Sequence, residues 1–227
     1  MHSAEDIKKM VGTYAAQFVQ QDSVIGLGTG STVYWLLQEL GNRVKQGLRF
    51  TAVPTSTQTL TLGKELGITF TELNDIEELS ITIDGADEAD PQLQLIKGGG
   101  GALLQEKMVA AATKKLIIIA DHTKMVEELG KFPLPVEVIP FGWKQVQKNI
   151  AKLGCEKIEL RNRNNHTYIT DNHNYILDCY FGTIKNAASL NAALHSIPGV
   201  VETGLFINMA STVITGYPDG TIVTIPQ

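Results

Sequence analysis

Short apolar strands that run into glycine-rich or acidic loops, each followed by a helical pattern, recur along the first half of this chain. The clearest strands are expected at 23–27, 81–83 and 116–120, because these short runs are rich in β-branched residues and end at glycine or aspartate. The alternation of strands and helices predicts a largely parallel sheet with helices on its faces. Further strands are expected at 49–53 and 93–96, and helices at 4–20, 31–46, 56–66 and 102–113.

The pattern changes after the segment KFPLP, 131–135, where two prolines stiffen the chain. The elements expected beyond it follow the order β-α-β-β-(β)-α-β, which resembles a split βαβ, ferredoxin-like unit. Two final strands are joined by YPDG and predict a hairpin that returns to the first domain. The sequence thus predicts a parallel-sheet α/β domain, 1–130 plus 204–227, and a smaller α+β domain, 131–203.

The charge balance and the spacing of special residues exclude several classes of protein. Lys and Arg number 19 against 24 Asp and Glu, a formal charge of −5, and no basic run is present, so we expect no nucleic-acid partner. The longest dense apolar run is too short to span a bilayer, and the N-terminus has charges where a signal peptide needs an apolar core. Two cysteines without CxxC spacing and five histidines without ligand spacing predict no disulfide framework and no metal site. We expect a soluble, cytoplasmic protein.

The loop GLGTGSTV joins an expected strand to an expected helix. Gly26, Gly28 and Gly30 let the backbone bring several amides to one anion, and the helix N-terminus adds partial positive charge. Ser31 and Thr32 supply further donors. The loop lacks the Gly-Lys of a Walker loop and the final glycine of the dinucleotide fingerprint. Taken alone, it predicts either a phosphate site or a tight turn with a Ser/Thr cap.

The acidic segment DGADEAD begins at Asp84 and follows an expected strand. In open α/β sheets, ligands lie at the carboxyl ends of the strands. Asp84 and Asp87 would serve as an acid and a base if they lie together and their pKa values split. The alternatives are a solvated acidic loop and a divalent-metal site, although the segment shows no full oxygen cage or histidine partner.

The segment KGGGGALLQEK begins at Lys97 and again places a glycine-rich loop between a strand and a helix. The Lys97 ammonium can meet an oxyanion, and the glycines at 98–101 can direct several amides at developing negative charge. Glu106 stands about one turn into the helix, where its carboxylate can act as a proton-transfer base. The alternative for Glu106 is a favourable interaction with the helix macrodipole. Four consecutive glycines cost backbone entropy unless their conformation is required.

Two further loops complete the set. VPTST contains Ser56 and Thr57, which most simply cap the next helix, and IADHTK ends at Lys124, either a substrate lysine or an exposed one. All these loops follow expected strands, so we expect them to share one edge of a sheet. Together they favour proton transfer on a small phosphorylated or oxyanionic substrate, without a cofactor.

The motifs GLGTGST, VPTS, DGADE, KGGGGAL and KFPLPVEVIP occur in this order and are followed by TDNHNYILD, IPGVVETGLF and YPDG. They resemble the type A ribose-5-phosphate isomerase family, from about residue 5 to the C-terminus. The resemblance implies a Rossmann-like parallel-sheet domain with a smaller ferredoxin-like α+β domain, in a homodimer or homotetramer. It also implies interconversion of ribose 5-phosphate and ribulose 5-phosphate, a step of the pentose phosphate pathway, through an enediolate and without cofactor or metal.

The same resemblance implies roles for individual residues. Glu106 matches the proton-transferring glutamate, and Lys97 matches the lysine that stabilises the enediolate oxygen. Asp84 and Asp87 match the paired aspartates that assist ring opening and handle hydroxyl protons. The substrate-binding positions implied by the resemblance are Thr29, Gly30, Ser31, Thr32, Asp84, Gly85, Ala86, Asp87, Lys97, Gly98, Gly99, Gly100 and Lys124.

Two other classes of protein remain as alternatives. The first is a non-catalytic sugar-phosphate-sensing domain, as in DeoR-type repressors, although residues 1–22 are too short for their helix-turn-helix. The second is a CoA-transferase-like enzyme, which would use a glutamate as nucleophile. Covalent trapping of a glutamate by an acyl-CoA would favour that second alternative.

Overall fold

The computed structural model describes residues 1–226 and divides into two compact units. The first unit is built from Met1–Ala86, Gln105–Met125 and the segment that starts at Met209, and the second from Asp87–Leu104 and Val126–Asn208. Residues 87–104 therefore lie in the second unit, whereas the expected first domain, 1–130, includes them. The domain limits expected from the sequence stay a prediction.

A seven-stranded sheet forms the centre of the first unit. Its strands are β1 Ser23–Leu27, β2 Phe50–Pro54, β3 Thr69–Phe70, β4 Ile81–Gly85, β7 Leu116–Asp121, β15 Ala210–Gly216 and β16 Ile222–Pro226. They are arranged in the order β16-β15-β7-β4-β1-β2-β3. Every neighbouring pair is parallel except β15 and β16, which form an antiparallel hairpin. The predictions of a largely parallel sheet and of a hairpin that returns to it are confirmed.

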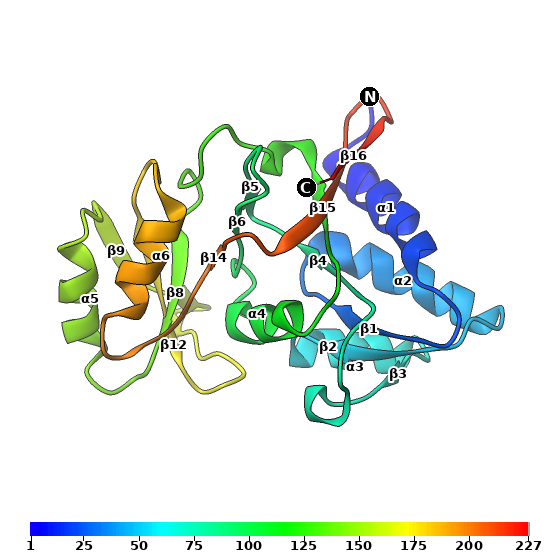
Figure 1. Ribbon diagram of the computed structural model, residues 1–227, viewed down its shortest axis with the longest axis horizontal. Coiled ribbons are helices and arrows are strands. Elements are labelled where there is room, and N and C mark those ends of the chain that lie inside the picture. Colours follow the sequence, from blue (N-terminus) through cyan, green and yellow to red (C-terminus); the bar gives the residue numbers. More distant parts are fainter. Residues whose placement is uncertain (227) are drawn as a thin grey trace. The chain divides into compact units, whose positions relative to one another are not determined.

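Helices cover both faces of this sheet. They are α1 Ala4–Ala15, α2 Ser31–Lys45, α3 Thr57–Glu65 and α4 Leu103–Ala111, the last of which belongs to the first unit from Gln105 onward. The helices α1 and α2 lie side by side (Figure 1), and with α3 they pack on the cluster that contains Ala52. Val109 of α4 packs on a different cluster, with Val53. Because successive side chains of a strand point to opposite faces, these two clusters lie on opposite sides of the sheet.

Local sequence signals start two of these helices. Ser3 and Asp6 form a capping box at α1. Ser56 Oγ accepts the Thr59 amide at 3.1 Å and caps α3, as expected from VPTST. Among residues 1–226, no helix is both long enough and apolar enough to cross a membrane.

The second unit contains a four-stranded antiparallel sheet and two helices. They are β8 Leu134–Val138, α5 Trp143–Ala151, β9 Lys157–Leu160, β12 Tyr175–Tyr180, α6 Ala187–His195 and β13 Val200–Thr203. This chain order is that of a ferredoxin-like unit, and the strands are arranged in the order β13-β8-β12-β9. Val146 and Ile150 of α5 and Leu194 of α6 share one apolar cluster with the sheet. The prediction of a ferredoxin-like α+β unit is confirmed.

The second unit also holds short strand pairings that the sequence did not predict. They are β5 Glu88–Ala89, β6 Leu95–Ile96 and β14 Leu205–Phe206 in the order β14-β6-β5, and the pair β10 Asn162–Arg163 and β11 His166–Thr167. The strand before Lys97 was expected to share an edge with the parallel sheet, and this expectation is wrong. That strand, β6, pairs antiparallel with β5 because the chain turns back between them, with Leu93 at a φ of 57°.

Glu137 is a buried carboxyl at the centre of the four-stranded sheet. It lies on β8, where its Oε1 accepts from Thr170 Oγ1 at 2.9 Å and from Asn174 Nδ2 at 3.0 Å. Burial raises the pKa of Glu137, and the charge of Glu202, its cross-strand neighbour on β13, raises it further. The hydrogen bonds from Asn174 and Thr170 oppose this shift but do not cancel it.

Because the pKa of Glu137 is raised in the folded chain, the free energy of unfolding is expected to fall as pH rises. In the unfolded chain Glu137 ionises at its ordinary value, whereas in the folded chain its ionisation is delayed, so stability is lost as pH rises between the two values. Replacement by Gln keeps an acceptor for Thr170 and removes the ionisation. We therefore expect Glu137→Gln to gain stability relative to the parent protein as pH rises above 4.5, the ordinary value for a glutamate, measured by urea unfolding.

The matched control is Glu159→Gln on β9, in the same four-stranded sheet. Glu159 is exposed, and its hydrogen bond with Lys157 lowers its pKa from the ordinary value of 4.5, so its replacement alters the pH dependence of stability only below that value and leaves it unchanged above it. A stability difference between Glu137→Gln and the parent that does not change with pH would contradict the role of Glu137.

Candidate active site

A chain of four hydroxyl groups holds the loop that follows β1. Thr29 Oγ1 lies 2.8 Å from Thr55 Oγ1 and donates to Ser56 Oγ at 2.8 Å. Ser56 Oγ donates to Thr59 Oγ1 at 3.2 Å, and Thr59 Oγ1 donates to the Gly28 carbonyl at 2.7 Å. Each hydrogen bond in such a chain polarises the next, which strengthens the whole. The VPTST segment therefore orients Thr29 as well as capping α3.

The Asp84 carboxylate joins this loop to the end of β4. It is 1% exposed, and its Oδ1 accepts the Thr29 amide at 3.1 Å and the Gly85 amide at 2.7 Å. A Cβ at position 28 would lie 2.0 Å from Asp84 Oδ1, so this approach requires Gly28. The loops after β1 and β4 are thus fixed relative to each other by one buried carboxylate.

The N-terminus of α2 has the character of an anion site. Gly30 and Ser31 are exposed there, and Thr32 is buried. No acidic residue stands in the first turn of this 15-residue helix, so no side chain of that turn neutralises the partial positive charge of its amides. Exposed amides at a helix N-terminus are donors that a phosphate can use.

In the second unit, Lys97 and its glycine-rich loop follow β6. Lys97 is 2% exposed, and its Nζ lies 5.3 Å from the centre of the Phe206 ring. Gly98 has a φ of 102°, a conformation that favours glycine. Asp87 Oδ2 accepts the Gly99 amide at 2.7 Å. The Asp87 carboxylate therefore holds the backbone of the glycine loop, as Asp84 holds the loop after β1.

Glu106 and Lys124 both lie in the first unit. Glu106 stands in the first turn of α4 and is 4% exposed. Lys124 is half-buried at the end of the short turn His122–Lys124, which follows β7 and begins at Asp121. Asp121 caps that turn by accepting the Thr123 amide at 3.0 Å. The Glu106 carboxylate is shielded from water by its burial and is therefore suited to proton transfer.

The residues expected at the site divide between the two units. The first unit contains Thr29, Gly30, Ser31, Thr32, Asp84, Gly85, Ala86, Glu106 and Lys124. The second unit contains Asp87, Lys97, Gly98, Gly99 and Gly100. Within the first unit, the structure ties Thr29 directly to Asp84, and within the second it ties Asp87 directly to Gly99. Sequence reasoning missed Thr55 and Thr59, whose only signal was a cluster of hydroxyl residues after β2.

The acidic segment after β4 is not a solvated loop. Glu88 and Asp90 are buried, and Glu88 accepts the amides of Gly130 and Phe132 at 2.7 and 2.6 Å. These two carboxylates hold backbone, so the alternative of a solvated acidic loop is wrong for them. Among residues 1–226, no group of three or more His, Cys, Asp or Glu side chains has the arrangement of a metal site.

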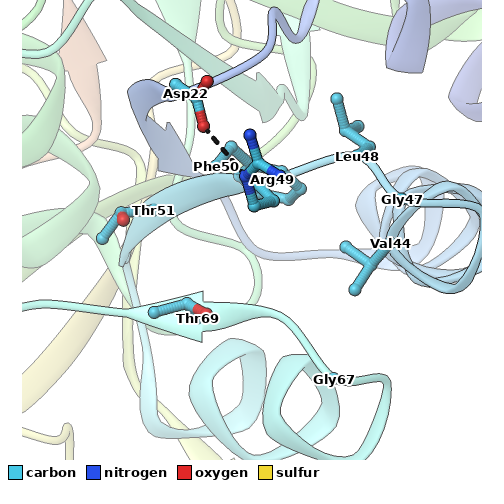
Figure 2. Close-up of a pocket in the computed structure, with 9 residues that line it drawn as sticks. All are labelled: Asp22, Val44, Gly47, Leu48, Arg49, Phe50, Thr51, Gly67 and Thr69. Atoms are coloured by element: carbon cyan, nitrogen blue, oxygen red, sulfur yellow. Dashed lines mark hydrogen bonds and ion pairs between the residues drawn. The ribbon is translucent and has the colours of Figure 1, made fainter.

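A surface pocket of about 490 Å³ lies at the start of β2, away from these loops (Figure 2). Its lining residues are Asp22, Val44, Gly47, Leu48, Arg49, Phe50, Thr51, Gly67 and Thr69. The loops expected to bind substrate follow the other end of β1 and β2, at Leu27 and Pro54. Arg49 Nε donates to Asp22 Oδ1 at 3.3 Å, and both side chains are exposed, so water screens this ion pair. The pocket contains no residue of the expected site.

Comparisons with known proteins agree over nearly the whole chain. The sequence model of the family ribose 5-phosphate isomerase A (phosphoriboisomerase A) matches residues 51–220. A ribose-5-phosphate isomerase A of Bacillus cereus is 60% identical over 216 residues, which cover 95% of this chain and 98% of the relative. The Plasmodium falciparum ribose 5-phosphate isomerase has 39% identity and a TM-score of 0.95, with 98% of this chain and 99% of that one covered.

A further solved structure is a D-ribose-5-phosphate isomerase in complex with phospho-erythronic acid. It has 37% identity and a TM-score of 0.96, and both chains are covered completely, at 100%. The fold and these relatives together define an aldose–ketose isomerase of sugar phosphates. More narrowly, this chain belongs to the ribose 5-phosphate isomerase A family. The resemblance inferred from the motifs is confirmed, and the relatives do not support the sugar-phosphate sensor.

The chain of hydroxyl groups leads to a prediction about the free energy of unfolding. Thr59→Val keeps the shape of the side chain but leaves the buried Gly28 carbonyl without its hydroxyl donor. We expect this variant to lose about 1–3 kcal/mol of unfolding free energy, measured by urea unfolding. Thr59→Ser keeps the donor and is expected to lose less. Equal stability of the two variants would show that the hydroxyl is not what holds the loop.

Proposed function

We propose that this chain interconverts D-ribose 5-phosphate and D-ribulose 5-phosphate, with Glu106 as the group that carries a proton between C2 and C1. The observation that carries this assignment is the buried carboxylate of Glu106 in the first turn of α4. A positioned carboxylate that is shielded from water can accept and return a proton without exchanging it freely with solvent. Family membership supplies the substrate pair.

The reaction balances without a further reactant. Glu106 takes the hydrogen of C2 as a proton, and the electron pair forms the C1–C2 double bond of an enediolate whose charge rests on O1. The carboxyl then returns the proton to C1, while O2 gives up its proton and O1 gains one. We assign these hydroxyl protons, and the opening of the sugar ring, to Asp84 and Asp87, whose carboxylates are held by backbone amides.

The enediolate charge needs fixed donors. We assign this role to the Lys97 ammonium and to the amides of Gly98, Gly99 and Gly100. Lys97 is buried, and a charge in a site that excludes water acts more strongly on an oxyanion than it does in bulk solvent. One well-placed donor of this kind contributes about 3 kcal/mol to stabilisation of a transition state.

The substrate phosphate is assigned to the N-terminus of α2. Gly30 and Ser31 are exposed there, and the first turn contains no acidic residue. Thr29 and Thr32 flank these positions, and Lys124 supplies a positive charge. Gly85 and Ala86, which follow Asp84, complete the proposed substrate contacts.

The ligand of one relative supports a phosphorylated, oxyanionic substrate. Phospho-erythronic acid, bound in that relative, carries a phosphate at one end and a carboxylate at the other. An enediolate derived from ribose 5-phosphate carries the same two kinds of negative charge. The proposed division of roles, with α2 for the phosphate and Lys97 with its glycine loop for the enediolate, matches a ligand of this chemistry.

We further propose that the chain acts in the cytoplasm, without metal or cofactor, as a homodimer or homotetramer that binds no nucleic acid. The formal charge of −5 and the lack of a basic run support the last point. Light scattering on the purified protein measures the oligomeric state directly.

Isomerisation in D2O tests the activity. After treatment with EDTA, the purified protein is expected to form ribulose 5-phosphate from ribose 5-phosphate and to introduce some deuterium at C1, followed by NMR. Solvent hydrogen enters because the carboxyl that holds the proton exchanges it during part of the turnovers. Binding of ribose 5-phosphate without turnover would contradict the isomerase and favour a sensor.

Glu106→Gln tests the assignment of the base. The amide cannot accept the C2 proton, so kcat is expected to fall by about 10²–10⁴-fold while calorimetry still detects binding of ribose 5-phosphate. The matched control is Glu65→Gln, which changes an exposed carboxylate of α3 and should leave kcat unchanged. Turnover near the parent rate in Glu106→Gln would remove Glu106 from the proton transfer.

A further inference from the structure

Arg161 lies directly after β9 and reaches the glycine loop of the same unit. Its Nη1 donates to the Gly98 carbonyl at 2.7 Å and to the Gly99 carbonyl at 3.3 Å. On the other side, its Nε donates to Asp178 Oδ2 at 2.9 Å, and its Nη2 pairs with Asp178 Oδ1. The Arg161 side chain is 11% exposed, so solvent screens these contacts little. One guanidinium therefore connects the loop to a carboxylate in the sheet.

Asp178 is a rigid anchor for this contact. It lies on β12, which is bonded to β8 on one side and to β9 on the other. Its two oxygens meet the guanidinium in the bidentate geometry that arginine favours. The position of Arg161 is thus set by the ferredoxin-like sheet, and the same position determines where the loop carbonyls lie.

The peptide between Gly98 and Gly99 is held from both edges. Its carbonyl accepts from Arg161, and its amide donates to Asp87 Oδ2 at 2.7 Å. The carbonyl of Gly98 also accepts the Gly101 amide at 2.9 Å, which closes the turn. A peptide fixed at both its donor and its acceptor cannot rotate about its flanking bonds without losing one of them.

The next peptide presents its amide away from Arg161. The Gly99 carbonyl faces the guanidinium, and the carbonyl and N–H of a trans peptide point in opposite directions, so the Gly100 amide points to the other side. Gly100 is the exposed residue of the loop. Tyr168 covers the following residue, because a Cβ at position 101 would lie 2.2 Å from its hydroxyl oxygen.

We propose that Arg161, anchored by Asp178, is a positioning residue of the isomerase. It fixes the carbonyl edge of the loop so that the Gly100 amide is presented to the enediolate oxygen. This inference rests on the proposed function of Lys97 and the glycine loop. Arg161 itself is not assigned any contact with the substrate.

The charge of Arg161 adds to the effect of its geometry. A charge-assisted hydrogen bond to a carbonyl polarises the whole peptide and makes its N–H a stronger donor. Asp178 balances the positive charge, so the loop gains this polarisation without a net charge beside it. A neutral side chain of the same size would supply neither the fixed orientation nor the polarisation.

The experiment compares Arg161→Lys with the double variant Arg161→Met/Asp178→Leu. In Arg161→Lys, a positive charge still pairs with Asp178, but lysine cannot bond both Asp178 oxygens and both loop carbonyls. The double variant removes the Arg161–Asp178 pair, and with it the contact to the loop, without leaving a buried charge unpaired. The control is Lys157→Ala, which removes an exposed cation from β9, the strand that directly precedes Arg161. Each is examined by circular dichroism, thermal unfolding, and kcat and KM for ribose 5-phosphate.

We expect Arg161→Lys and the double variant to fold and to lose kcat by about 10–100-fold with little change in KM, because the amide is misplaced mainly for the transition state. Lys157→Ala is expected to retain the parent kcat. In Arg161→Ala, added methylguanidinium is expected to restore part of the lost kcat. Rescue of this kind would not follow if Arg161 only stabilised the fold.

The proposal would be overturned if Arg161→Lys and the double variant both have the same kcat per folded molecule as the parent. Loss of activity only in proportion to the fraction unfolded would overturn it as well. Lys97→Ala separates this failure from failure of the proposed function. If Lys97→Ala is inactive while the Arg161 variants are unimpaired, only the positioning role of Arg161 is wrong. If Lys97→Ala retains the parent kcat, the proposed function of the loop is wrong, and the positioning role of Arg161 is wrong as well.

Discussion

The arrangement of the loops in the first unit depends on one buried carboxylate, that of Asp84. A parallel sheet places the ends of β1 and β4 side by side, but it does not fix the loops that follow them. Asp84, on β4, does so by accepting the Thr29 amide from the loop after β1 and the amide of Gly85 at the end of β4, and the hydroxyl chain that starts at Thr55 extends the network to the loop after β2. Three strand ends are thus joined by polar contacts whose loss would leave buried groups unsatisfied.

The second unit uses the same principle with different residues. There, Asp87 and Arg161 hold opposite edges of one glycine peptide, and Glu88 holds the backbone at Gly130. Glycine loops gain freedom of conformation and lose the restraint that side chains provide. In both units, buried or half-buried charged side chains from neighbouring segments supply that restraint. Rigid loops are useful in an isomerase because donors fixed in advance need not reorganise as the enediolate charge forms.

Much of the fold could be predicted because its signals are local. The strand β1 begins and ends at the residues expected, and the hairpin at YPDG is present. The sheet β14-β6-β5 could not be predicted, because its strands have two residues each and β14 pairs with a strand far away in the sequence. The strand before Lys97 was assigned to the wrong sheet because its partner β5 has only two residues, so no sequence pattern marked their pairing.

The candidate site shows the same division between local and distant signals. The glycine loops, Asp84 and Glu106 stand out in the sequence because their residue types and spacing are unusual. The only signal of Thr59 was the cluster of hydroxyl residues after β2, and Arg161 lies in the turn-rich segment RNRNN without any motif. Their contacts join segments that are distant in sequence, so only the folded chain reveals them.

The position of β15 in the sheet constrains the order in which the chain can fold on the ribosome. β15 lies between β7 and β16 and is the parallel neighbour of β7, although the second unit separates them in the sequence. Until residues 210–216 have been synthesised, β7 is an edge strand, apolar from Leu116 to Ala120, with one side unpaired. The ferredoxin-like sheet, whose strands all precede β15, can form earlier. The nascent chain therefore begins the seven-stranded sheet with its first strands, but it can complete that sheet only after β15 and β16 have emerged.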